Sequence, residues 1–316
     1  MIDSLAKILG VVLNQVFDVI YGLSPVGSLG ITIILFTIFV KVLMLPLMLN
    51  QQKSMKRMQK VQPEIQKIQD KYKNKKDPES QKQMNQELGE FYQNNKINPL
   101  GGCLPLIIQM PIFLALFRVL QRAGTYITKL HDLYYLIATK ITTVQGYEVL
   151  LKEIVKDNPR IKLSEDTLKT VEGIQSILPQ LTTNAWHTIT SKFPGIPADT
   201  IVNKENIEYF LGISLVDSPS DLMGQGVIVA VVLFVFISGF TTFLSSKVMT
   251  MGNKQQQNDQ ALQTQKTMNM IFPLLTAWMT YSLPAGLGIY WITSNIFQIV
   301  QQIGINKYME KVGEGE

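Results

Sequence analysis

One apolar stretch, residues 29–50 (LGITIILFTIFVKVLMLPLMLN), constrains this chain more than any other feature. About twenty apolar residues are enough for a helix to cross the hydrocarbon core of a bilayer, which is roughly 30 Å thick. Lys41 lies near the middle of the stretch. A charge at that depth costs about 2.5–3.5 kcal/mol even on lenient insertion scales, so it needs a compensating environment. The sequence therefore predicts a polar or water-filled space inside the membrane, with Lys41 facing it.

Apolar residues gather in further blocks of membrane-spanning length, separated by strongly polar segments. Hydrophobic residues make up 46% of the 316 positions, and this block pattern is typical of a polytopic helical membrane protein. Pro105, Gln109 and Pro111 interrupt the second block, where prolines are tolerated if neighbouring groups satisfy the freed carbonyls. We therefore predict an all-α fold with five transmembrane helices, over residues 29–50, 98–120, 222–244, 268–283 and 284–305.

Catalytic and cofactor-binding patterns do not appear in the sequence. The chain has one cysteine, Cys103, and two widely separated histidines, His131 and His187, which argues against a disulfide and against a metal site built from cysteine or histidine. The glycine-rich nucleotide loops and the common hydrolase motifs are absent from the sequence as well. We expect no enzyme activity, no cofactor and no metal.

Two polar regions flank the first block. In residues 1–28 the apolar side chains recur at helical spacing beside Asp3 and Lys7, which favours an amphipathic helix lying in the membrane interface over a signal peptide. Residues 51–97 are highly charged, yet their apolar residues form two seams with a break at 74–78. This pattern predicts an antiparallel helical hairpin and favours it over a plain solvated linker.

The distribution of lysine and arginine sets the predicted orientation. The hairpin carries eleven of them, whereas residues 1–28 carry only Lys7. Because cytoplasmic loops are enriched in positive charge, we place the hairpin in the cytoplasm, the N-terminus outside and the C-terminus inside. The remaining segments are an extracytoplasmic insertion with helical pieces at 121–221, whose function is not readable, a cytoplasmic loop at 245–267 and a cytoplasmic tail at 306–316.

Three motifs resemble a known family, and the second and third of them are long and unusual. They are FVKVLMLPLMLNQQKSMKRMQKVQPEIQKIQDKY at 39–72, NPLGGCLPLIIQMPIFLALFRVL at 98–120 and LPAGLGIYWITSNIFQIVQQ at 283–302. Together with the first block they resemble the YidC-type membrane protein insertases, in their five-span form. The match covers the five-span core and leaves out the 121–221 insertion and the N-terminal stretch.

The resemblance implies a membrane protein insertase and chaperone in the bacterial cell membrane. In this family the spans enclose a hydrophilic groove that is open to the cytoplasm and to lipid and closed on the far side. A basic residue lies in that groove, an arginine in most members, and Lys41 stands at the matching position. Gln109 and Trp291 match further polar groove positions, and Thr37 and Tyr290 match positions that contact the substrate.

The residues themselves are compatible with such a groove. Thr37 precedes Lys41 by one helical turn, so both face the same side. None of the five blocks contains Asp or Glu, so a carboxylate partner for Lys41 is not expected, and a role in a groove is favoured over a structural one. Gln109 is equally compatible with a role as an interhelical hydrogen-bond donor. The Thr37 hydroxyl is also compatible with a hydrogen bond to its own helix. The last block is polar and aromatic near its middle, through Tyr290, Trp291, Ser294 and Asn295.

The residues alone are also compatible with two other classes of protein. A small-solute transporter or channel would also bury a lone lysine, but it usually shows internal repeats, and the blocks here show none. A membrane scaffold would dock its partners through the basic hairpin. For an insertase we expect nascent membrane proteins, the ribosome, a targeting receptor and the Sec translocon as partners, within a lipid bilayer and with no sequence-specific nucleic acid.

Overall fold

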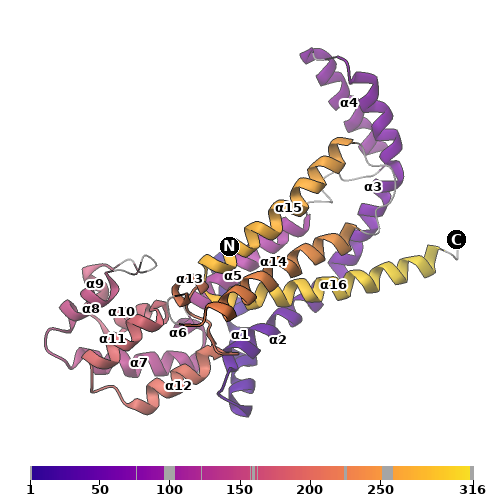
Figure 1. Cartoon of the computed structure of the whole chain (residues 1–316). Coiled ribbons are helices and arrows are strands. Elements are labelled where there is room, and N and C mark those ends of the chain that lie inside the picture. The colour runs from indigo at the N-terminus through magenta and orange to yellow at the C-terminus, as the bar shows by residue number, and fades with distance from the viewer. Residues whose placement is uncertain are drawn as a thin grey trace.

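The computed structural model describes residues 2–75, 77–95, 104–121, 123–156, 158, 161, 163–223, 226–250 and 259–313. Over these ranges the fold is mostly helical, as predicted, with a single antiparallel sheet of two very short strands. Figure 1 shows three parts: long helices bundled in the middle, a hairpin leaving the bundle at one end, and a group of short helices at the other end.

The bundle contains the apolar blocks. Its helices are α1 (Ile2–Leu23), α2 (Ser28–Leu43), α5 (Leu104–Gln121), α14 (Ile228–Thr250), α15 (Asp259–Ser282) and α16 (Ala285–Gly313). α14 packs against both α15 and α16, and α16 packs against α2. Gly288 allows this close packing, because a Cβ there would lie 2.5 Å from the Phe234 ring. The bundle therefore brings the first and last predicted spans side by side.

Two described helical stretches are long and apolar enough to cross a membrane alone, Ser4–Leu23 and Ile228–Met249. A third candidate is the bent pair formed by α2 and the start of α3 (Leu45–Tyr72), and the apolar part of α5, Gln109–Leu120, is shorter. These findings agree with a helical membrane protein of several spans. The count of five remains a prediction.

α1 meets the length and composition of a span, although we predicted an interfacial helix there. One face of α1 is buried against the bundle and includes Ala6, Gly10, Leu13 and Phe17. Asn14 ties the helix to the chain that follows α5, since its Oδ1 accepts a hydrogen bond from the Thr128 amide at 2.8 Å. The interfacial position of α1 stays a prediction beside this new alternative.

The first predicted span, 29–50, is bent and not straight. α2 ends at Leu43, and the helix that begins at Leu45 leaves at an angle of 51°. Pro46 lies in the first turn of α3, where its missing N–H is not needed. Inside one continuous helix its ring would clash with the carbonyl four residues earlier, so the chain breaks at this point.

The last three helices run beyond the apolar blocks that predicted them. α14 continues to Thr250, α15 already begins at Asp259, and α16 reaches Gly313. Parts of the predicted loop at 245–267 and of the predicted tail at 306–316 are therefore helical, while 251–258 and 314–316 lie outside the described residues. The added start of α15 contains Gln260, Gln263 and Gln265, and glutamine is a good helix former.

The predicted hairpin region holds α3 and α4 (Pro78–Asn94), which pack against each other. Asp77 caps α4, because its carboxylate accepts a hydrogen bond from the Ser80 amide at 2.8 Å. Glu87 joins the two helices, receiving hydrogen bonds from Lys71 Nζ and from the Tyr72 hydroxyl, each at 2.8 Å. Figure 1 shows this pair projecting from the end of the bundle.

The insertion, predicted as helical pieces, is a packed group of short elements. Its sheet pairs Tyr209 with Ser214 and Phe210 with Ile213. The end of the insertion is fastened to α16, since Asp217 O and Leu215 O accept hydrogen bonds from the first two amides of that helix. The elements are α6 (Ala123–Tyr126), α7 (Thr128–Thr142), α8 (Tyr147–Val155), α9 (Glu165–Leu168), α10 (Val171–Ile177), the 3₁₀ turn η2 (Leu178–Gln180), α11 (Thr183–Lys192), α12 (Ala198–Glu208), β1 (Tyr209–Phe210), β2 (Ile213–Ser214) and α13 (Pro219–Leu222).

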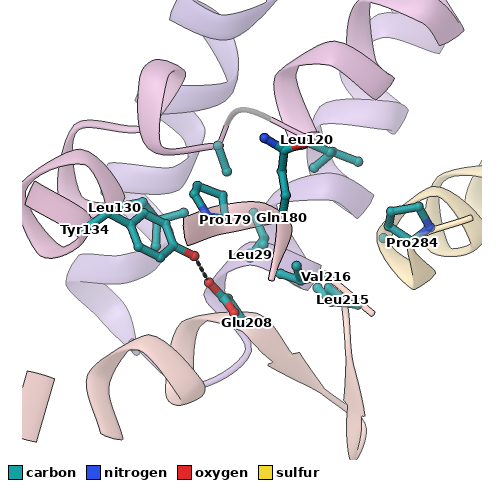
Figure 2. A pocket seen from close by; sticks show the side chains of 12 residues that line it. Leu29, Leu120, Leu130, Tyr134, Pro179, Gln180, Glu208, Leu215, Val216 and Pro284 are labelled. Carbon is teal, nitrogen blue, oxygen red and sulfur yellow. Dashed lines mark hydrogen bonds between the residues drawn. The ribbon is translucent and has the colours of Figure 1, made fainter. Parts of the chain in front are cut away.

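A buried ionic cluster holds the insertion together. Lys204 Nζ lies 2.7 Å from Glu208 Oε2, with the two side chains 6% and 2% exposed. Glu208 also accepts a hydrogen bond from Tyr134 of α7, and the Lys204 ammonium lies 4.3 Å from the centre of the Trp186 ring. Figure 2 shows the Tyr134–Glu208 contact beside a cavity of about 30 Å³, where Leu29 of α2 and Pro284 before α16 also lie. The cluster thus sits where the insertion meets the bundle.

Candidate functional site

Lys41 lies inside the bundle at one end of a short polar chain of contacts. The side chain projects from α2 and is 4% exposed. Its ammonium donates a hydrogen bond to Gln109 Oε1 of α5 at 3.1 Å, and the Gln109 amide in turn donates to the Tyr290 hydroxyl of α16. Three helices of the bundle therefore meet through Lys41, Gln109 and Tyr290, which the sequence had predicted to share one groove.

The charge on Lys41 is not matched by a carboxylate among the described residues. Its hydrogen-bond partner there is a neutral amide, and no Asp or Glu oxygen of the described chain lies within 4.0 Å of it. A single neutral acceptor offsets only part of the desolvation of an ammonium group. The described residues therefore leave this buried charge incompletely compensated.

An aromatic group from α5 and α16 adjoins this polar chain. The Trp291 and Phe113 rings are stacked with centroids 5.2 Å apart, and Phe113 also lies 6.4 Å from the Tyr290 ring. Such offset pairs add to the packing energy of the helices. Trp291 therefore faces α5, next to the predicted groove residues, and is only partly exposed.

The other three predicted site residues behave differently from one another. Thr37 is buried on the same helix as Lys41, but its hydroxyl donates to its own helix, at Ile33 O, 2.6 Å away. Ser294 is buried one turn beyond Tyr290, on the same face of α16. Asn295 points toward α14 instead, since its amide donates to the Thr241 and Thr242 hydroxyls at 3.3 and 2.8 Å. Asn295 therefore joins helices away from the Lys41 contacts.

Sequence reasoning missed a second polar group at the hairpin end of the bundle. Gln52 of α3 donates to Gln302 of α16 at 2.7 Å, and Gln301 and Gln298 donate to the sulfurs of Met48 and Met249 at 3.2 and 2.9 Å. The signal available in the sequence was the helical spacing of the α16 glutamines, which line one side of that helix. These contacts tie the base of α3 to α16 and α14.

Together these features define a multi-pass helical membrane protein that keeps a buried lysine between three of its helices. Comparison with known proteins makes the class specific. A sequence model of the family described as 60Kd inner membrane protein matches residues 21–312. The chain belongs to this family.

Similar curated proteins carry one common name. A protein named "Membrane protein insertase YidC" from Fusobacterium nucleatum is 30% identical over 283 residues, which cover 89% of this chain and 88% of that protein. A protein of the same name from Oceanobacillus iheyensis is 27% identical, over 89% of this chain and 75% of its own length. A third, from Caldanaerobacter subterraneus, is 26% identical over 92% of this chain and 90% of its length.

Proposed function

We propose that the protein is a membrane protein insertase, which brings newly made membrane proteins into the bilayer and helps them fold. Membership of the 60Kd inner membrane protein family and the names of the similar proteins support this. The observation that carries the proposal is Lys41, a buried cation between three membrane helices whose partner among the described residues is a neutral amide.

In this proposal the five predicted spans enclose a hydrophilic groove around Lys41. An incoming segment must carry a short polar tail across hydrocarbon, and a wet groove through part of the bilayer lowers the desolvation cost. Lys41 attracts acidic residues of the tail through a medium that screens charge less than bulk water. Gln109 and Tyr290 hold the ammonium in place, and the apolar part of the substrate leaves sideways into lipid.

The parts at the two ends of the bundle suggest how the groove is used. The insertion is fastened to the first residues of α16, which fits a groove that is closed at that end. The hairpin projects from the other end and is strongly basic, which fits contact with the ribosome, a targeting receptor or the Sec translocon. This assignment places the hairpin and C-terminus in the cytoplasm of a bacterial cell and the N-terminus outside.

The test is insertion by the purified full chain in liposomes, using single-span substrates whose translocated tails differ only in acidic residues. Lys41→Ala should insert acidic tails less efficiently than the parent, while neutral tails should be little affected. An interaction of about 1 kcal/mol corresponds to about a fivefold change. Lys41→Glu should be worse through like-charge repulsion, and Lys41→Arg should keep activity because it keeps the charge.

Lys247→Ala is the matched control, since it removes an exposed lysine from the last turn of α14. It should insert both kinds of tail as the parent does. Equal insertion of acidic tails by Lys41→Ala, Lys41→Glu and the parent would remove the electrostatic part of the proposal. Failure of the parent to insert any substrate, combined with flux of small solutes, would instead indicate a transporter or channel.

A further inference from the structure

The turn that joins β1 to β2 has a strained and exposed apolar tip. Leu211 and Gly212, its two central residues, have φ angles of 51° and 78°. Both positive angles belong to the tight hairpin turn that usually carries Asn-Gly, because a branched side chain is unfavourable in the left-handed region. Leu211 is nevertheless 84% exposed. A polar residue would suit this position better if it faced water. The leucine therefore indicates that an apolar environment covers this position.

The β1–β2 strand pair lies against the beginning of α2, where the first membrane stretch starts. The Phe210 ring covers Gly30, since a Cβ on that glycine would lie 2.4 Å from the ring. A Cβ on Gly27, directly before the same helix, would lie 3.2 Å from the same ring. These two contacts place the strand pair beside the end of a membrane helix and not at the outer edge of the insertion.

The turn between α1 and α2, which the β1–β2 strand pair contacts, is apolar and exposed as well. Leu23 is 81% exposed and Val26 is 61% exposed. Single exposed apolar residues need no explanation, but a group at the end of a membrane helix does. This group continues the apolar surface of α2, whose side chains at Leu35, Ile38 and Phe39 are also exposed.

We propose that Leu211, together with Leu23 and Val26, forms a lipid contact that anchors the insertion to the membrane at the end where α2 begins. The turn between β1 and β2 then lies at the level of the lipid headgroups and the first acyl carbons. Removal of Leu211 from water compensates for its backbone strain. The insertion then lies against the bilayer at this edge, and its opposite edge, with α8 and α9, stays in water.

The experiment uses the full chain in phosphatidylcholine vesicles, with Cys103→Ser and one new cysteine carrying an environment-sensitive fluorophore. The probe at Leu211→Cys should emit at shorter wavelength and be quenched by lipids that carry a nitroxide near the top of the acyl chain. Val149→Cys is the matched control, because Val149 is also apolar and 70% exposed but lies on α8, far from the bundle in Figure 1. Its probe should remain sensitive to aqueous iodide and be quenched several-fold less by the nitroxide lipid.

Leu23→Cys gives an independent reading of the same contact and should resemble Leu211→Cys. The proposal is overturned if the probes at Leu211 and Leu23 respond like the probe at Val149. It is equally overturned if the Leu211 probe is shielded from iodide without quenching by lipid, and if that shielding grows with protein density. That result would assign the surface to a second copy of the chain.

Discussion

Lys41 and Lys204 are both buried lysines, yet they have different kinds of partner. Lys204 has a carboxylate at 2.7 Å and an aromatic ring at 4.3 Å, which together surround the ammonium. Lys41 bonds to the neutral Gln109 amide. A buried ion pair suits a structural role, whereas a buried ammonium whose partner among the described residues is neutral retains affinity for an anion. We infer that Lys204 stabilises the insertion and that Lys41 acts on substrate.

Glu208→Ala should strongly destabilise the insertion. The substitution leaves the Lys204 charge buried without its carboxylate, and loss of one partner of a buried pair typically costs about 3–5 kcal/mol. It also removes the acceptor of the Tyr134 hydroxyl. Thermal unfolding in detergent measures the effect. Glu208→Gln, which keeps an oxygen acceptor, should lose less.

Glu165→Ala is the control for that comparison. Glu165 pairs with Lys152 at 3.7 Å at the surface, where ion pairs contribute little. Its melting temperature should stay close to that of the parent. If Glu208→Ala melted at the same temperature as Glu165→Ala, the buried cluster would not be a stabilising element.

Within the hairpin, α4 packs mainly against α3. α4 has no buried residue in the part of the chain that the structure describes, and its contact with α3 includes the exposed Lys71–Glu87 ion pair. Segments with little buried apolar surface open at low free energy. We therefore predict that the hairpin moves relative to the bundle.

The contact between α3 and α4 should weaken in acid. Hydrogen bonds from Lys71 and Tyr72 lower the pKa of the Glu87 carboxyl from its ordinary value of 4.5. A group with a lowered pKa stabilises the folded state above the ordinary value, and this contribution is lost as the pH falls through the folded value. Energy transfer between dyes on α3 and α4 should therefore decrease below pH 4.5. Glu87→Gln should remove this step, whereas Glu90→Gln on the exposed side of α4 should retain it.

The elements also show which features a sequence can predict. The membrane blocks and the paired seams of the hairpin follow from local periodicity, which is why their helices were expected. The bend before Pro46 could be inferred only with hindsight, since prolines are also tolerated within membrane helices. The insertion depends on contacts between distant residues, such as Tyr134 with Glu208 and Phe210 with Gly30, and periodicity carries no information about them.

The same limit applies to the candidate site. Lys41, Gln109 and Tyr290 come from three motifs that resemble one family, and the structure brings them into contact. Asn295 was grouped with them because the last block is polar and aromatic near its middle. Its pairing with Thr241 and Thr242 depends on how α16 is rotated against α14, and a single sequence does not define that rotation.

At the scale of the whole molecule, polar contacts occur at three levels along the bundle. The Gln52–Gln302 contact lies at the hairpin end, Lys41 with Gln109 lies between, and the Glu208 cluster lies where the insertion begins. The outer surface of α14 and α15 is apolar by contrast and contains a pocket of about 890 Å³ lined by residues such as Phe236 and Leu274. The buried polar contacts lie within a largely apolar core and are separate from the apolar outer face of α14 and α15, as the proposed groove requires.

The last prediction follows from that separation. A photo-reactive benzophenone placed at Gln109 or Tyr290 should capture a stalled nascent chain, because both residues lie beside Lys41 in the proposed groove. The same group at Phe236, which is 62% exposed on the outer face of α14, should capture mainly lipid. Ile296 provides a second control because it is exposed on α16, the helix that carries Tyr290. Cross-linked ribosome-bound chains resolved on denaturing gels give the yields. A defined groove requires yields at Gln109 and Tyr290 well above those at Phe236 and Ile296, and equal yields at all four positions would mean that substrates use the apolar surface without a defined route.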